Sequence, residues 1–132
     1  MPKKILIADD EQMIRDVIKI LLTDQGHEIH ETGDGLEALR IAKEMVPDLV
    51  ILDLMMPGML GYEVCKQLRK NESTQNVYVM LITGQGQAAS SVLKDCGGDE
   101  LVAKPFNLSD LRERINQVLE GEVVKQRMKT PE

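Results

Sequence analysis

Residues 49–58 read Leu-Val-Ile-Leu-Asp-Leu-Met-Met-Pro-Gly, a run of four apolar residues that ends at Asp53. A strand that is apolar on both faces is typical of a parallel sheet that helices cover on both sides. Pro57 and Gly58 are turn-forming residues, so we expect the chain to leave this strand through a loop at 55–61. The stretch therefore predicts a buried parallel strand with a carboxylate at its carboxyl end.

On both sides of this stretch, short strand patterns alternate with amphipathic helix patterns. Further strands are expected at 4–8, 27–32, 77–82 and 101–103, and helices at 11–25, 36–45, 62–70, 88–96 and after Asn107 or Ser109, either of which can cap the last helix. The alternation predicts a doubly wound α/β fold with right-handed crossovers. We expect one domain over residues 1–121 and a polar segment, 122–132, that is a frayed helix end or the start of a linker.

The composition excludes several classes of function. The chain has 132 residues, a formal net charge of −6, no Trp and one Phe. Nucleic-acid surfaces need clustered Lys and Arg, and often aromatic rings for stacking, so we expect no direct nucleic-acid binding. No apolar run approaches the roughly 20 residues that span a bilayer, so we expect no membrane segment and a cytoplasmic protein. Cys65 and Cys96 lack metal-ligand spacing and are expected to be reduced and packed as small apolar side chains.

Polar side chains close four of the expected strands: Asp9, Asp10, Asp53, Thr83 and Lys104. Ligands of open parallel sheets bind beyond the carboxyl ends of the strands, so these five groups should converge. Three carboxylates together favour a hard divalent cation such as Mg²⁺. Lys104 and Thr83 can then hold phosphate oxygens, and Asp53 is the candidate nucleophile for an acyl phosphate.

Each of these residues, taken alone, also has a structural explanation. Asp9 and Asp10 could cap a helix, Thr83 could be an ordinary strand-end residue and Lys104 a solvated surface lysine. The functional interpretation rests on their occurring together in chain order. Competing motifs are absent: the sequence has no GxxxxGK[ST], GxGxxG or GxSxG. His27 and His30 are expected on opposite faces of a strand and are not interpreted as ligands.

Five stretches carry a family resemblance: Ile7-Ala8-Asp9-Asp10-Glu11, Leu49 to Gly58, Gly61-Tyr62-Glu63, Leu81-Ile82-Thr83-Gly84 and Ala103-Lys104-Pro105-Phe106. With them, the chain from Lys3 to about Leu119 resembles the receiver domain of two-component response regulators. The resemblance implies a flavodoxin-like, five-stranded parallel sheet of strand order 2-1-3-4-5 with five helices.

The resemblance also implies roles for the residues at the strand ends. Asp53 is then the phosphoacceptor. Asp10 binds Mg²⁺ directly, Asp9 assists directly or through water, and Asp53 and the backbone carbonyl of Met55 complete the protein ligands. Thr83 and Lys104 hold the phosphoryl oxygens, and the Lys104–Pro105 peptide is cis. The implied donor is a phosphohistidine on a sensor histidine kinase or a phosphotransfer protein.

Phosphorylation would then switch the surface of the fourth helix, fifth strand and fifth helix. The implied partners are a downstream protein or an output domain outside this sequence, and a phosphorylation-dependent homodimer. The sequence does not distinguish a stand-alone regulator from part of a longer chain. Leu101 stands where the family often has Phe or Tyr, so it either repacks during switching or is simply part of the core. Met55 and Gln85 are hypothesised to tune the lifetime of the phosphoryl group.

Two other functions were weighed. A metal-dependent phosphatase of small substrates usually needs a second carboxylate two residues beyond the nucleophile, and Met55 occupies that place. A binding module that works without phosphorylation would not need the intact acidic set with Thr83 and Lys104. We therefore expect a switch that assists its own phosphorylation and dephosphorylation rather than an ordinary turnover enzyme.

Overall fold

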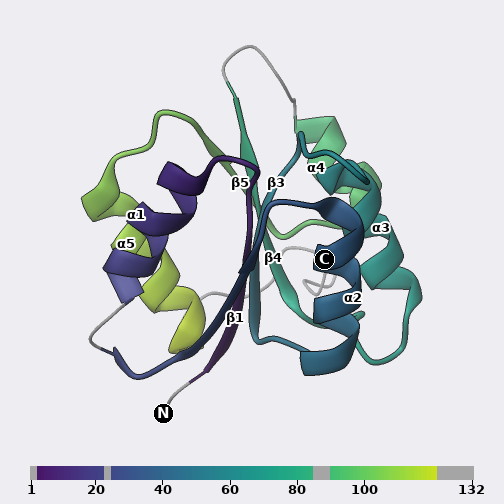
Figure 1. Ribbon diagram of the computed structural model, residues 1–132, viewed down its shortest axis with the longest axis horizontal. Helices are drawn as coiled ribbons and strands as arrows, with labels where there is room; N and C mark the ends of the chain where they lie inside the picture. Colours follow the sequence, from purple (N-terminus) through teal and green to yellow (C-terminus); the bar gives the residue numbers. More distant parts are fainter. Residues whose placement is uncertain (1–2, 23–24, 85–89, 122–132) are drawn as a thin grey trace, which may run out of the picture.

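The computed structural model describes residues 3–22, 25–84 and 90–121. Within these residues strands and helices alternate along the chain, as the sequence pattern predicts (Figure 1). Their order is β1 (Lys4–Ala8), α1 (Gln12–Leu22), β2 (Glu28–Thr32), α2 (Gly35–Met45), β3 (Leu49–Asp53), α3 (Gly61–Lys70), β4 (Tyr78–Thr83), α4 (Ser90–Cys96), β5 (Glu100–Ala103) and α5 (Leu108–Leu119).

The five strands form one parallel sheet in the order β2-β1-β3-β4-β5. Figure 1 shows α1 and α5 on one face of this sheet and α2, α3 and α4 on the other. The predicted doubly wound, flavodoxin-like topology is thus confirmed. None of the helices in the described residues is long and apolar enough to cross a membrane.

The central strand β3 supplies side chains to two separate cores because neighbouring residues of a strand point to opposite faces. Leu49 and Ile51 pack toward α1 and α5, whereas Val50 and Leu52 pack toward the other three helices. All four side chains are fully buried. Burying one such side chain stabilises the fold by about 2 kcal/mol, so the central strand is held firmly from both sides.

Several element boundaries differ from the sequence expectation by one to three residues. The first helix begins at Gln12 because the Glu11 amide donates to Asp9 Oδ1 in the preceding turn. The second strand begins at Glu28, and the ring of His27 instead accepts a hydrogen bond from the Lys3 amide. Asn107 is confirmed as the cap of α5, since its side chain accepts from the Asp110 amide. Residues 88–89 of the expected fourth helix and the segment 122–132 lie outside the described residues.

The loop after β3 is fastened to the body of the fold by close backbone contacts. The Gly61 amide donates to the Leu54 carbonyl, and a Cβ on Gly61 would lie 2.0 Å from the Asp53 carbonyl oxygen. The Gly35 amide donates to the Pro57 carbonyl, so the start of α2 contacts the same loop. These glycines allow backbones to approach closely and so hold the segment that follows Asp53.

The end of α2 carries a strained residue. Val46 is the C-cap of this helix and has φ 47°, in the left-handed region. A β-branched side chain rarely adopts this conformation because its Cβ approaches the following carbonyl. The strain lies on the edge of the sheet opposite to the strand ends that carry the polar residues, since Pro47 and Asp48 lead into the start of β3.

Candidate functional site

Three carboxylates meet at the carboxyl ends of β1 and β3. Oxygens of Asp9, Asp10 and Asp53 all lie within 4.8 Å of one another. Parallel pairing of Ala8 with Leu52 places the next residues along the chain, Asp9 and Asp53, side by side. Asp9 and Asp53 are buried, whereas Asp10 is exposed at the mouth of the cluster. The arrangement predicted from the strand ends is therefore present.

Lys104 brings a cation into this acidic cluster. Its ammonium nitrogen lies 3.1 Å from Asp9 Oδ2, 3.5 Å from Asp53 Oδ2 and 2.6 Å from Glu11 Oε1. Partial burial lowers the pKa of Lys104, but the hydrogen bond with Glu11 and the negative charges of Asp9 and Asp53 outweigh this and raise the pKa above its usual 10.5. The lysine therefore stays charged and offsets part of the acidic cluster's repulsion.

Asp53 has an unusually high pKa for an aspartate. Burial, together with the negative charges of Asp9 and Asp10, raises the pKa from its usual 3.8 to about 6. The amide of Met55, which donates to Asp53 Oδ1 at 3.1 Å, and the charge of Lys104 act in the opposite direction. The carboxylate is thus still ionised at neutral pH, but its charge is poorly compensated.

The structure places the other predicted residues around this cluster. Thr83 is buried at the end of β4, and its backbone carbonyl accepts from the Lys104 amide at 2.8 Å. The Thr83 hydroxyl donates to the Gly84 carbonyl. Leu101 pairs with Leu81 across the sheet and packs on the core under α2, α3 and α4. The Lys104–Pro105 peptide bond is cis, and Gln85 lies outside the described residues.

The donor set fits a divalent cation. Asp9 Oδ2 is buried and accepts no hydrogen bond within the described part of the chain, although Lys104 lies close to it. An ionised oxygen without a hydrogen bond is costly in a buried place, and a cation would satisfy it. Mg²⁺ prefers a few carboxylates supplemented by water and phosphate oxygens, which is what Asp9, Asp10 and Asp53 could provide. Met55, whose backbone carbonyl is the additional predicted ligand, follows in the loop after β3.

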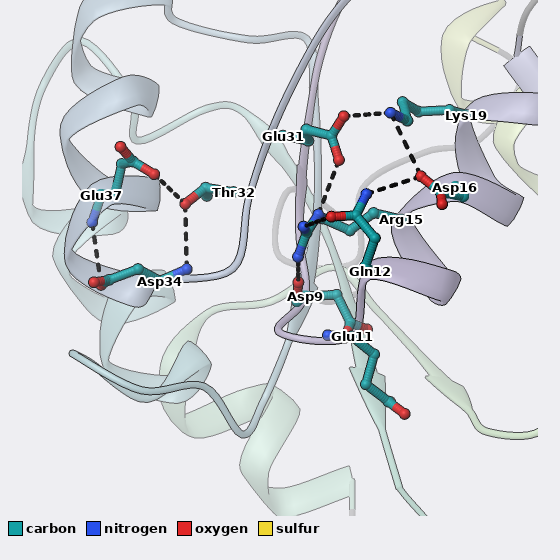
Figure 2. A network of polar contacts seen from close by, with 10 residues as sticks. All are labelled: Asp9, Glu11, Gln12, Arg15, Asp16, Lys19, Glu31, Thr32, Asp34 and Glu37. Carbon is teal, nitrogen blue, oxygen red and sulfur yellow. Dashed lines mark hydrogen bonds and ion pairs between the residues drawn. The ribbon is translucent and has the colours of Figure 1, made fainter.

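Sequence reasoning missed two residues of this region, Arg15 and Glu31. Figure 2 shows the Arg15 side chain between the Asp9 backbone and the Glu31 carboxylate, both of which accept hydrogen bonds from it. Arg15 follows Glu11 by four positions, a spacing that sequence alone would assign to an ordinary helix-surface ion pair. Its actual partners come from β1 and β2, so only the packed structure identifies them.

The cysteines and histidines lie away from the site. Cys65 and Cys96 are free and buried, and the Cys65 thiol donates to the Cys96 carbonyl at 3.2 Å. They are therefore packed side chains, as expected. His30 is exposed beside Glu28, and His27 joins the chain segments before β1 and β2. The expectation that both histidines lie in one strand is wrong for His27, because β2 begins one residue later.

Comparisons with known proteins agree with this geometry. The family model described as "Response regulator receiver domain" matches residues 5–116. The chain is 35% identical over 120 residues to the "DNA-binding dual master transcriptional regulator RpaA" of Synechocystis sp., which covers 90% of this chain and 49% of RpaA. It is 35% identical over 116 residues to the "DNA-binding response regulator MtrA" of Mycobacterium leprae, which covers 87% of this chain and 50% of MtrA.

Solved structures show the same fold. The chemotaxis response regulator CheY4 of Vibrio cholerae matches with a TM-score of 0.81 at 28% identity, covering 89% of this chain and 99% of CheY4. The chain spans about half the length of the curated relatives it matches.

Proposed function

The chain belongs to the family of response regulator receiver domains, and we propose that it is a phosphorylation switch whose phosphoacceptor is Asp53. A single observation supports this most strongly: Asp9, Asp10 and Asp53 gather oxygens within 4.8 Å, and Lys104 lies in contact with two of the three carboxylates. This combination brings a nucleophile, a cation site and a fixed positive charge to one edge of the sheet.

The proposed chemistry is transfer of a phosphoryl group from a phosphohistidine to Asp53. A carboxylate oxygen of Asp53 forms the new P–O bond as the P–N bond to the imidazole breaks, and the imidazole leaves with the electron pair. Lys104 and Thr83 hold the phosphoryl oxygens during this exchange. Mg²⁺, held by Asp9, Asp10, Asp53 and the Met55 carbonyl, would neutralise charge on the phosphoryl group when bound. The donor would be a sensor histidine kinase or a phosphotransfer protein.

The electrostatics of the site suit this role. With a pKa of about 6, Asp53 is mostly ionised at neutral pH and can act as the nucleophile. Burial and the acidic neighbours nevertheless destabilise the charge of Asp53. Binding of a cation and phosphorylation of the carboxylate would therefore both relieve this electrostatic destabilisation. Positioning and charge neutralisation are the main requirements of phosphoryl transfer.

We further propose that the switch acts on the surface of α4, β5 and α5. The Thr83 carbonyl accepts a hydrogen bond from the amide of Lys104, the first residue after β5, so a movement of Thr83 would displace the end of that strand. Leu101 packs in the core on this strand and could repack in place of an aromatic ring. The targets would be a downstream protein, an output domain like those implied by the longer DNA-binding relatives, or a second copy of the chain in a phosphorylation-dependent homodimer.

Autodephosphorylation is proposed to limit the lifetime of the phosphoryl group. We propose that Met55 affects this lifetime, because the residue is 51% exposed beside the site and its amide donates a hydrogen bond to Asp53. A charged residue at this position would change access of water to the phosphoryl group. The Met55→Glu variant is therefore expected to change the hydrolysis rate, and an unchanged rate would remove Met55 from this role.

The test of the function is phosphorylation by a small donor. The protein is incubated with Mg²⁺ and acetyl phosphate, and its intact mass is recorded beside that of Asp53→Asn. One added phosphoryl group on the wild type and none on the variant would support the proposal. An adduct on both proteins would move the acceptor to another residue. Absence of an adduct with acetyl phosphate, with a kinase donor and with the beryllofluoride mimic would contradict phosphorylation altogether.

A further inference from the structure

Arg15 is the most extensively bonded side chain beside the acidic cluster that is not assigned a role above. Its guanidinium donates to the Asp9 carbonyl at 2.5 Å, to Glu31 Oε1 at 2.9 Å and to Gln12 Oε1 at 2.6 Å (Figure 2). Only 13% of the side chain is exposed. The planar fork of an arginine can satisfy acceptors in several directions at once, which an ammonium cannot do.

The partners of Arg15 are themselves held in place. Glu31 lies on β2 and forms a second ion pair with Lys19 of α1. The hydrogen bond from Lys19, reinforced by that from Arg15, holds the pKa of Glu31 below its usual value despite partial burial. Gly33 covers the guanidinium, since a Cβ there would lie 3.0 Å from Arg15 Nη1. The arginine is thus confined between α1, β2 and the turn after β2.

Arg15 contacts the backbone of the proposed metal-binding residues Asp9 and Asp10. The carbonyl that Arg15 binds belongs to the peptide group joining Asp9 to Asp10. The Asp9 amide, on the other side of the same residue, donates to the Thr32 carbonyl at 3.1 Å. Asp9 is therefore held from both its peptide groups. Because the Asp10 side chain is exposed, packing constrains it little. The orientation of the preceding peptide therefore strongly determines where its carboxylate points.

We propose that Arg15 is a positioning residue that fixes the Asp9–Asp10 peptide and thereby presents both carboxylates to the cation. The inference rests on the proposed function, because Arg15 would position the residues of the same cation site. The contact runs to a backbone oxygen and not to a carboxylate. Arg15 therefore leaves the oxygens of the two aspartates available.

The positive charge of Arg15 makes this role testable by the sign of an effect. A charge effect alone predicts that removing a cation near three carboxylates strengthens Mg²⁺ binding. A positioning effect predicts the opposite, since supports around metal ligands typically contribute 10- to 100-fold in affinity. The two explanations therefore differ in direction and not only in size.

The experiment measures Mg²⁺ affinity of the whole chain by isothermal titration calorimetry, with Mg²⁺ alone as the probe. Arg15→Met is expected to raise the Kd about tenfold. Arg15→Lys keeps the charge but cannot reach both Asp9 and Glu31, so its Kd should also rise severalfold. Lys19→Met is the matched control, because it removes a cation from the same helix and from the same Glu31 without touching Asp9. Its Kd should stay within about twofold of the wild type or fall slightly.

Folding is checked by far-UV circular dichroism before each titration, and Arg15→Lys carries the test if Arg15→Met does not fold. At saturating Mg²⁺, Arg15→Lys should regain the wild-type rate of phosphorylation by acetyl phosphate, which a general structural defect would not allow. An unchanged or lower Kd in folded Arg15 variants would overturn the role of Arg15 alone. Failure of the wild type to bind Mg²⁺ would overturn both this role and the proposed function.

Discussion

Replacing Asp53 by Asn should stabilise the protein when divalent cations are absent. The Asp53 side chain is only 6% exposed and lies among two other carboxylates, with its pKa raised from 3.8 to about 6. One pKa unit corresponds to about 1.4 kcal/mol, so this rise corresponds to about 3 kcal/mol of destabilisation by the ionised group. Asn has nearly the same shape and no charge, so it should recover much of that free energy.

The gain should depend on pH in a defined direction. Because the pKa is higher in the folded state, the folded chain binds the proton more tightly than the unfolded chain. The destabilisation is therefore absent below about pH 4 and develops as the pH rises through about 6. Asp53→Asn should exceed the wild type by about 3 kcal/mol at pH 8 and by little at pH 4.

Urea unfolding followed by far-UV circular dichroism, in EDTA, measures both free energies of unfolding across this range. Asp16→Asn is the control for removing one negative charge, because Asp16 is half-exposed on α1; its effect should stay below about 0.5 kcal/mol. Millimolar Mg²⁺ should raise the stability of the wild type more than that of the variant, since the cation binds the folded state. An Asp53→Asn protein no more stable than the wild type at pH 8 in EDTA would show that the ionised Asp53 carboxylate does not destabilise the fold.

Three further substitutions test the fold. Arg69→Met should lower the free energy of unfolding by about 3–5 kcal/mol, because it removes the 2.8 Å ion pair of the fully buried Asp99 carboxylate. The control Arg40→Met breaks an exposed ion pair on α2 and should lower the free energy of unfolding by less than about 0.5 kcal/mol in the same urea titration. Equal losses in the two variants would show that burial of the ion pair does not matter. Gly35→Ala should cost at least about 2 kcal/mol, since its Cβ would lie 1.8 Å from the Met59 carbonyl oxygen, and a calorimetric Tm equal to that of the wild type would show that the loop yields freely. Val46→Asn should add about 1 kcal/mol, because Asn tolerates the left-handed conformation that strains Val, and a lowered Tm would mean that the valine side chain matters more than its backbone.

Much of the site was predictable from sequence because it depends on strand ends. Asp9 and Lys104 directly follow a strand and Asp53 ends one, and parallel strands bring their carboxyl ends to one edge. The contacts of Lys104 with both aspartates follow from that topology. The chemical roles of these residues remain proposals, but their proximity did not require knowledge of side-chain packing.

The hydrogen bonds that hold the site residues in place were not predictable in the same way. Arg15 looks like a helix-surface residue, and its contacts with Asp9 and Glu31 arise only when α1 packs against β1 and β2. Sequence patterns report the period of burial along one element, but they do not report which neighbour a long polar side chain reaches. The same limit applies to the hydrogen bond from the Cys65 thiol to the Cys96 carbonyl.

The amino-acid pattern was enough to predict the alternation of strands and helices, the double-sided burial of β3 and the edge of the sheet at which polar groups gather, because these follow from local periodicity and parallel topology. Packing of the folded chain set the left-handed backbone of Val46, the buried Asp9 Oδ2 that accepts no hydrogen bond, and the hydrogen bond from Arg15 to the carbonyl of the Asp9–Asp10 peptide. Each of these depends on atoms from segments far apart in the chain, whose distances are set by packing.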